Sequence, residues 1–464
     1  MLRFPTLTHL MLALGPLSAL MLGGVLVTFE FLPWPAAVTA AVTWWCALWW
    51  LTEPVPIPVT SLLPMAIFPL LGILTPSEVA QSYGSPLILL LLGGFMLSEA
   101  LAKSGAHRRL ALMMIRVSAR LGQRGLVLGF MLAAATLSMW ISNTATTLML
   151  LPVALAVLEN DRLKPLTVPL LLGIAYAASI GGTGTPIGTP PNLIYMQVSQ
   201  DQFGVQTSFP AWMSFGLPVV LLFLPLMFIW LTRRVQSGAL PALEAPGAWQ
   251  PAEVRVLVVF SLTALAWVTR AAPFGGWQTW LGLDSANDAS VAMLAVVALC
   301  MIPNGDQAKP GRLLDWPTIR EIPWGVLILF AGGITIARAF IETGLSDSLA
   351  GQLAILSVLP TWLMVLLLCL GVTFLTEVTS NTATTSLLMP VLAATAVATD
   401  IPFELLMIPA AISASCAFML PVATAPNAVV YGSGKVTVKQ MMSEGLVLNL
   451  IGTVVITLVM LVRF

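Results

Sequence analysis

Long apolar stretches divide the chain, and polar residues gather in the short segments between them. A helix of about 20 apolar residues is long enough to cross a bilayer. The pattern therefore predicts an all-α polytopic membrane protein. We expect eleven transmembrane helices, near residues 10–30, 36–52, 55–74, 86–102, 168–197, 211–232, 253–272, 288–303, 324–340, 403–431 and 444–462.

Two further apolar stretches, at about 125–158 and 359–399, do not fit this count. The first contains no charged residue over 34 positions, which is too long for one span and too short for two spans joined by a turn. Basic residues flank it on both sides, so both of its ends carry the sign of the cytoplasmic side. We therefore expect two re-entrant helical hairpins, whose tips are buried in protein or line a water-filled cavity.

The positions of the basic residues predict an orientation for these elements. With the amino terminus in the cytoplasm, 17 of the 20 Lys and Arg residues fall inside, and only Arg270, Arg338 and Arg463 fall outside. An excess of basic residues in cytoplasmic loops is the usual pattern of multi-pass proteins. We therefore expect a protein of the cytoplasmic (inner) membrane, with its carboxyl terminus outside.

Composition narrows the classes of function. Hydrophobic residues make up 58% and charged residues 9% of the 464 positions, which excludes a soluble globular fold. Lys and Arg balance Asp and Glu at 20 each, so no net charge attracts nucleic acid. Two histidines and four isolated cysteines offer neither a catalytic triad nor a metal site. We find no HExxH motif and no close pair of acids within the membrane, so an intramembrane enzyme is disfavoured.

The chain contains an internal repeat. The sequence SNTATT occurs at 142–147 and again at 380–385. PIGTPPN (186–192) and PVATAPN (421–427) follow at nearly the same offset, and the expected spans run in opposite directions in the two halves. We therefore predict inverted-topology repeats over 36–234 and 253–463, with 1–35 as an extra amino-terminal helix. Inverted repeats with broken helices at the midplane are typical of secondary transporters.

The repeated motifs predict a binding site. Ser, Asn and Thr cap helix N-termini, so each SNTATT marks a helix start, whose free N–H groups and dipole attract an anion. Prolines in the second pair of motifs break the helices expected at about 168–197 and 403–431, which frees backbone carbonyls. Because these motifs contain no Lys or Arg, a bound anion needs co-bound cations to offset its charge. The pattern indicates cation-coupled anion transport.

A purely structural interpretation competes with this one, since capped kinks of small residues also let helices pack closely. Their duplication in both halves favours a binding site. Among the acids, Glu53 is expected to cap a helix end, whereas Glu377 leaves a proton-carrying role and a hydrogen-bonding role beside the site open. Pairing within one helix is expected for Glu99 with Lys103 and for Arg338 with Glu342.

At these residues the chain resembles the divalent anion/sodium symporter family of sodium-coupled dicarboxylate and citrate transporters. The resemblance covers nearly the whole chain and implies a homodimer in the lipid bilayer, in which a transport part moves against a scaffold as an elevator. One departure is Ala425, where the family commonly has a proline. The matching segments are WWLTEPVPIPVTSLLPM (49–65), SMWISNTATT (138–147), GTPPN (188–192), TEVTSNTATT (376–385) and PVATAPNAVVYGSG (421–434).

The resemblance also implies the residues that bind. One sodium site would use Ser138, Ser142, Asn143 and the backbone near Gly188, and a second would use Thr376, Thr379, Asn381 and the backbone near Ala423. The substrate carboxylates would be bound by Ser142, Asn143, Thr144, Thr189, Ser380, Asn381, Thr382 and Thr424.

We therefore predict a secondary active transporter that carries small C4 dicarboxylates such as succinate, malate and fumarate together with sodium ions. A sodium-independent dicarboxylate exchanger, or a citrate or sulfate carrier on the same scaffold, stays open, because each needs the same anion site. A channel is disfavoured, since hairpins that meet at the midplane argue against a continuous pore.

Overall fold

The computed structural model describes residues 5–236, 238, 240, 247–271, 275–353 and 359–464. Throughout this part of the chain the regular structure is helical, and the described residues form no β-strand. Eight helical segments among them are long and apolar enough to cross a membrane. These findings confirm the expected all-helical membrane fold, while the number of eleven spans stays a prediction.

The first half of the chain contains two elements that position the site, the helical hairpin α8–α9 and the broken helix α10–α11. Its elements are α1 (Pro5–Thr28), α2 (Trp34–Thr52), α3 (Ile57–Thr60), α4 (Leu63–Leu70), α5 (Pro76–Tyr83), α6 (Pro86–Ser104), α7 (Ala106–Ala119), α8 (Gly122–Ser138), α9 (Asn143–Leu158), η1 (Asp161–Leu166), α10 (Thr167–Gly181), η2 (Gly182–Gly184), α11 (Pro190–Phe203) and α12 (Phe209–Thr232).

The second half has the same order of a long helix, a hairpin and a broken helix. Its elements are α13 (Pro251–Thr269), α14 (Gly276–Trp280), α15 (Asp288–Met301), α16 (Trp316–Ile319), α17 (Trp324–Glu342), α18 (Leu345–Leu353), α19 (Thr361–Thr376), α20 (Asn381–Thr399), α21 (Phe403–Ser413), α22 (Ala425–Gly432) and α23 (Val438–Arg463).

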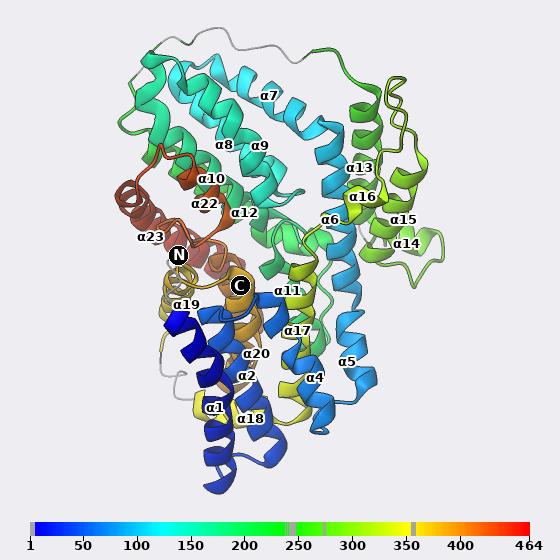
Figure 1. The fold of residues 1–464 in the computed structure, drawn as a ribbon, viewed down its shortest axis with the longest axis vertical. Coiled ribbons are helices and arrows are strands. Elements are labelled where there is room, and N and C mark those ends of the chain that lie inside the picture. The colour runs from blue at the N-terminus through cyan, green and yellow to red at the C-terminus, as the bar shows by residue number, and fades with distance from the viewer. Residues whose placement is uncertain (1–4, 237, 239, 241–246, 272–274, 354–358) are drawn as a thin grey trace.

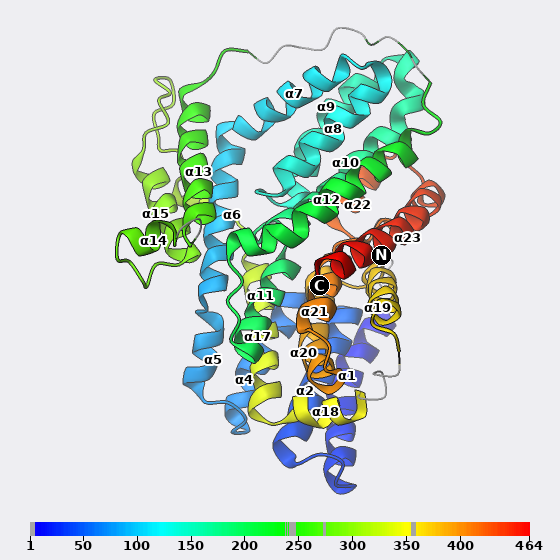
Figure 2. The same ribbon diagram turned by 180° about the vertical axis from the view of Figure 1, so that it is seen from behind.

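The amino-terminal helices lie at one end of the molecule and α7 lies at the other, as both views show (Figures 1 and 2). Helix α1 packs on α2, where the indole N–H of Trp49 donates to the carbonyl of Met11 at 3.0 Å. The stretch expected to span at 55–74 forms two short helices, α3 and α4, because the early proline Pro64 has no N–H to continue a single helix.

Helix α10 forms the centre of the main hydrophobic core. Every residue from Pro169 to Gly181 is buried, so this helix is covered on all its faces. A helix that is apolar all round belongs in the interior of a large protein or a membrane span. A second, smaller core surrounds α2, α4 and α17. The chain thus has two packed regions.

Charged residues near the ends of α6 and α17 pair across the two halves. The ammonium nitrogen of Lys103 lies 2.6 Å from Asp315 Oδ2, and this bond lowers the pKa of the Asp315 carboxyl to about 2. Arg338 lies 3.5 Å from Glu78 in α5. These partners differ from the ones expected within each helix, because α6 packs against α16 and α17 packs against α5.

Candidate functional site

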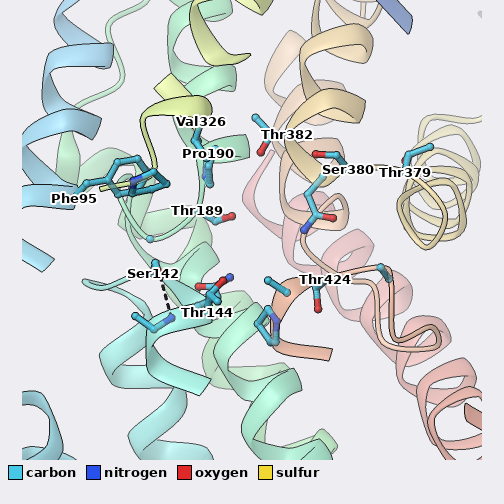
Figure 3. Close-up of a pocket in the computed structure, with 18 of the residues that line it drawn as sticks. Phe95, Ser142, Thr144, Thr189, Pro190, Val326, Thr379, Ser380, Thr382 and Thr424 are labelled. Atoms are coloured by element: carbon cyan, nitrogen blue, oxygen red, sulfur yellow. Dashed lines mark hydrogen bonds between the residues drawn. The ribbon is translucent and has the colours of Figure 1, made fainter. Parts of the chain in front are cut away.

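A cavity of about 660 Å³ lies where the two hairpin tips and the two helix breaks meet. Its volume is within the range of small-molecule sites. The described residues that line it include one acid, Glu53, and no Lys, Arg or His. Figure 3 shows the polar side chains gathered around this space, namely Ser142, Thr144, Thr189, Ser380, Thr382 and Thr424.

The first hairpin places its polar residues at the start of α9. Ser142 is the N-cap, and its hydroxyl accepts a hydrogen bond from the Ala145 N–H at 3.1 Å. Asn143 is the first residue of the helix. The hydroxyl of Ser138, buried at the end of α8, donates to the side-chain oxygen of Asn143. Ser138 therefore supports the tip from behind, while Ser142 and Asn143 line the cavity.

The second hairpin repeats this arrangement at the start of α20, where Ser380 is the N-cap. The Thr376 hydroxyl lies 2.6 Å from Asn381 Oδ1 and 2.9 Å from the Ala414 carbonyl oxygen. One hydroxyl proton can serve only one of these two acceptors. The three oxygens are therefore short of donors, and such a cluster suits a hard cation that takes oxygen ligands.

Thr379 differs from its neighbours. Its hydroxyl donates to the Leu375 carbonyl at 2.9 Å and lies 2.5 Å from the Thr384 hydroxyl. The side-chain oxygen is thus already engaged in the hairpin itself. A ligand role for Thr379 would fall to its backbone carbonyl.

Two asparagines hold the helix breaks in the same way. The amide nitrogen of Asn192 donates to the Gly182 and Thr185 carbonyls at 3.0 and 2.7 Å. The amide nitrogen of Asn427 donates to the carbonyls of Ala417 and Leu420, both at 3.0 Å. These bonds satisfy backbone carbonyls inside each break, where a buried carbonyl without a partner is costly. The two breaks are therefore fixed features of the fold.

Gly182 lies against the first tip. A Cβ at this position would stand 2.7 Å from Asn143 Oδ1 and 3.0 Å from the Gly188 carbonyl oxygen. Only glycine allows the backbone of the break to approach the tip this closely. Gly188 lines the cavity from α10–α11, and Ala423 lines it from α21–α22.

Four helices begin at the cavity wall. Helices α9 and α20 start at the hairpin tips, and α11 and α22 start just after the breaks, behind their N-caps Thr189 and Thr424. A helix start carries free N–H groups and about half a positive charge. These helix starts direct partial positive charge at the cavity, although no basic side chain among the described residues lines it.

The structure brings the predicted residues together, with two of them behind the wall. Ser138 and Thr376 are fully buried and contact the wall through asparagine side chains. Among the described residues, no group of three or more His, Cys, Asp or Glu side chains could hold a metal ion. The others line the cavity, namely Ser142, Asn143, Thr144, Gly188, Thr189, Thr379, Ser380, Asn381, Thr382, Ala423 and Thr424.

Several wall residues were not expected from the motifs. The main one is Glu53, at the C-cap of α2 in a left-handed conformation, which was expected only as an interfacial cap. The segment at 49–65, already singled out by the family resemblance, was the signal that pointed to it. The unpredicted apolar wall residues include Trp50, Phe95, Trp140, Val326, Val378 and Val422, and the unpredicted polar ones include Thr52 and Ser98.

Comparison with known proteins gives the family. The protein-family model described as "Citrate transporter" matches residues 47–406. A protein of Staphylococcus saprophyticus named "Sodium-dependent dicarboxylate transporter SdcS" is 40% identical over 441 residues, which cover 90% of this chain and 84% of that protein. A protein of the same name from Staphylococcus aureus strain USA300 is 39% identical over 472 residues, with 97% and 89% covered.

A solved structure shares the fold. The YdaH transporter of Alcanivorax borkumensis, described as having an unusual topology, aligns with a TM-score of 0.60 at 15% sequence identity. The alignment covers 92% of this chain and 98% of that one. The family and these proteins are transporters and not enzymes. The chain therefore belongs to the citrate transporter family, as its resemblance to the divalent anion/sodium symporters predicted.

Proposed function

We propose that this protein is a sodium-coupled symporter of small C4 dicarboxylates, such as succinate, malate and fumarate. The observation that carries the proposal is the cavity on which four helix N-termini converge and whose described lining residues include no Lys, Arg or His. Helix starts bind carboxylates through backbone N–H groups. The remaining negative charge of a dicarboxylate has to be offset by cations bound close by.

Two groups of oxygens, each partly in the wall and partly behind it, fit such cations. The first is the group of oxygens around Asn143, which includes the Ser138 hydroxyl, with Ser142 and the Gly188 backbone beside it. The second is the donor-poor cluster of Thr376, Asn381 and Ala414, which the backbones of the cavity-lining residues Thr379 and Ala423 would complete. The relatives' name, sodium-dependent dicarboxylate transporter, supports sodium as the cation and a dicarboxylate as the anion.

The carboxylates are proposed to lie between the two tips. Asn143, Thr144 and Ser142 would bind one end of the substrate, and Asn381, Thr382 and Ser380 the other. Thr189 and Thr424 lie beside them on the helix breaks. This arrangement gives a molecule with two separated carboxylates a partner at each end.

The transport cycle is proposed to be an elevator movement in a homodimer. The matching asparagine bonds of the two breaks support the proposed inverted repeats at 36–234 and 253–463. The excess of basic residues in the predicted inner loops supports a cytoplasmic amino terminus, re-entrant hairpins and a location in the cytoplasmic membrane. The homodimer and the elevator rest on the family resemblance. Light scattering of the purified protein tests the dimer, and a chiefly monomeric mass would contradict it.

Uptake into liposomes tests the proposed transport. Purified protein in vesicles should take up labelled succinate when an inward sodium gradient is applied, and choline in place of sodium should abolish uptake. Importing more cationic than anionic charge would couple uptake to voltage, at about 2.3 kcal/mol per charge per 100 mV. Uptake of equal rate without sodium would overturn the coupling.

Two other carriers remain as outcomes of this experiment. Counterflow from preloaded vesicles, with no uptake into empty ones, would identify a sodium-independent exchanger. Sodium-driven uptake of citrate or sulfate in preference to succinate would identify a carrier of those anions, as the name of the family model suggests for citrate.

A further inference from the structure

The acid Glu377 lies directly after α19 in the second hairpin, beside Thr376. Its side chain is buried, with 3% of its surface exposed, and it does not line the cavity. A buried carboxylate is expensive unless donors surround it. A role in lining the cavity therefore does not explain why an acid is buried at this position.

Four donors satisfy this carboxylate. Its Oε1 accepts from the backbone N–H groups of Phe418 and Met419, both at 2.8 Å, and its Oε2 accepts from the Leu420 N–H at 2.9 Å. The side-chain amide of Asn449, in α23, donates to Oε1 at 2.7 Å. Three successive N–H groups in the break between α21 and α22 thus share this side chain as an acceptor, and the Phe418 N–H also donates to Asn449 Oδ1 at 3.3 Å.

The same break supplies the wall of the second proposed cation site. Asn427 holds the Leu420 carbonyl at 3.0 Å, while Glu377 holds the N–H group of the same residue. The break is thereby fixed from both sides between Ala414 and Ala423. The carbonyl of Ala414 lies 2.9 Å from the Thr376 hydroxyl, so the carboxylate holds a segment whose ends contribute to that site.

The first half has no counterpart of this acid. The matching position is Met139, and the matching break continues as the 3-10 turn η2, in which glycine approaches Asn143 closely. The backbone support of the second break is therefore particular to that half. Replacing Glu377 should therefore affect the second proposed cation site and leave the first one unchanged.

We propose that Glu377 is a positioning residue for the second cation site, which holds the backbone from Phe418 to Leu420 in place without contacting ion or substrate. This inference rests on the proposed sodium-coupled transport. This role requires a side chain that only accepts hydrogen bonds, because every partner on this backbone segment is an N–H donor. A glutamine has the same shape, but its NH₂ would face backbone N–H groups.

The test compares sodium dependence with substrate dependence in Glu377→Gln. The sodium concentration for half-maximal succinate uptake should rise by about tenfold, the effect of losing a charge-assisted hydrogen bond. At saturating sodium the KM for succinate should stay close to that of the natural protein. Stabilisation of the purified protein by sodium alone, followed as a shift in Tm without substrate, should weaken in parallel.

Two further variants complete the test. Met139→Leu, at the matching position of the first half, should leave sodium dependence unchanged. Asn449→Ala removes one donor to Glu377 and a second acceptor of the Phe418 N–H, and it should raise the half-saturating sodium concentration less than Glu377→Gln does. If Glu377→Gln does not fold, the sodium dependence of Asn449→Ala tests the proposed role of Glu377 in its place.

An unchanged sodium dependence in both Glu377→Gln and Asn449→Ala would overturn the inference. So would a loss of uptake that higher sodium concentrations do not restore in folded protein. The proposed function fails separately, because in that case the natural protein itself would show no sodium-dependent uptake.

Discussion

The two helix breaks beside the cavity share one bond pattern and differ in their support. In both, an asparagine amide donates to two backbone carbonyls of the break. In the first half the break is a tight turn that depends on Gly182, whereas in the second half Ala417 takes that place and Glu377 binds the backbone. The polar groups that face the cavity are thus kept in both halves, while the backbone beneath them is held by different means.

This difference separates the residues that a site needs from those that merely hold it. Helix starts and asparagine tips are needed twice, because each end of the proposed substrate needs donors. The support only has to satisfy backbone groups and fill space, and a glycine turn or a buried acid does so equally well. Substitutions in the tips should therefore have similar effects in both halves, whereas those in the supports should not.

The largest expected effect is at the tips. Asn143→Ala and Asn381→Ala should each lower succinate uptake by at least about tenfold, because each removes a side-chain oxygen from a cation cluster and a donor to the substrate. Uptake into liposomes at equal amounts of folded protein measures this. Gel filtration should show that both variants elute as the natural protein does. Normal uptake by both would refute the assignment of the tips.

A large effect on uptake is expected at the break of the first half, and a much smaller one at the matching position of the second half. Gly182→Ala places a methyl group 2.7 Å from Asn143 Oδ1, so the tip has to move and uptake should fall severely. The reverse change, Ala417→Gly, should cost only the roughly 0.5–1 kcal/mol of added backbone freedom and keep most of the uptake. Uptake and Tm measured for both variants check this. Equal losses would mean that the two breaks are supported alike.

A moderate effect should distinguish the two threonine caps. The Thr424 hydroxyl accepts from the Asn427 N–H at 3.2 Å, whereas the Thr189 hydroxyl makes no such cap bond. Thr424→Val should therefore lower the stability of the fold by about 0.5–2 kcal/mol. Thr189→Val should instead raise the KM for succinate with Tm unchanged. Thermal unfolding together with uptake kinetics tests the pair, and a reversed pattern would contradict it.

The smallest effect is expected at the two ion pairs between the halves. Asp315→Asn removes the partner of Lys103, and Glu78→Gln removes that of Arg338. Such partly exposed pairs contribute about 0–1 kcal/mol. Tm should therefore shift little in either variant, and uptake should be retained. A loss of uptake in one of them would show that this pair takes part in the movement itself.

The local character of the site could be predicted, because capping is a local rule. Ser142 and Ser380 cap helix starts as their sequence implies, and the prolines mark the breaks. The partners of charged residues could not be predicted in this way. Lys103 and Arg338 had nearby acids in their own helices, yet the structure pairs them with Asp315 and Glu78, which only the packing of the two halves brings close.

The sequence by itself determined the membrane class, the hairpins' helix starts and the polar residue types that line the cavity, since hydrophobicity and capping act over neighbouring residues. The tertiary structure decided which of these groups share one cavity and what holds them there. Glu377 illustrates the division. Its place beside the tip was evident from the sequence, but its partners at Phe418, Leu420 and Asn449 lie 41 to 72 positions away. Hydrogen bonds over such separations depend on the packing of whole helices, which no local pattern encodes.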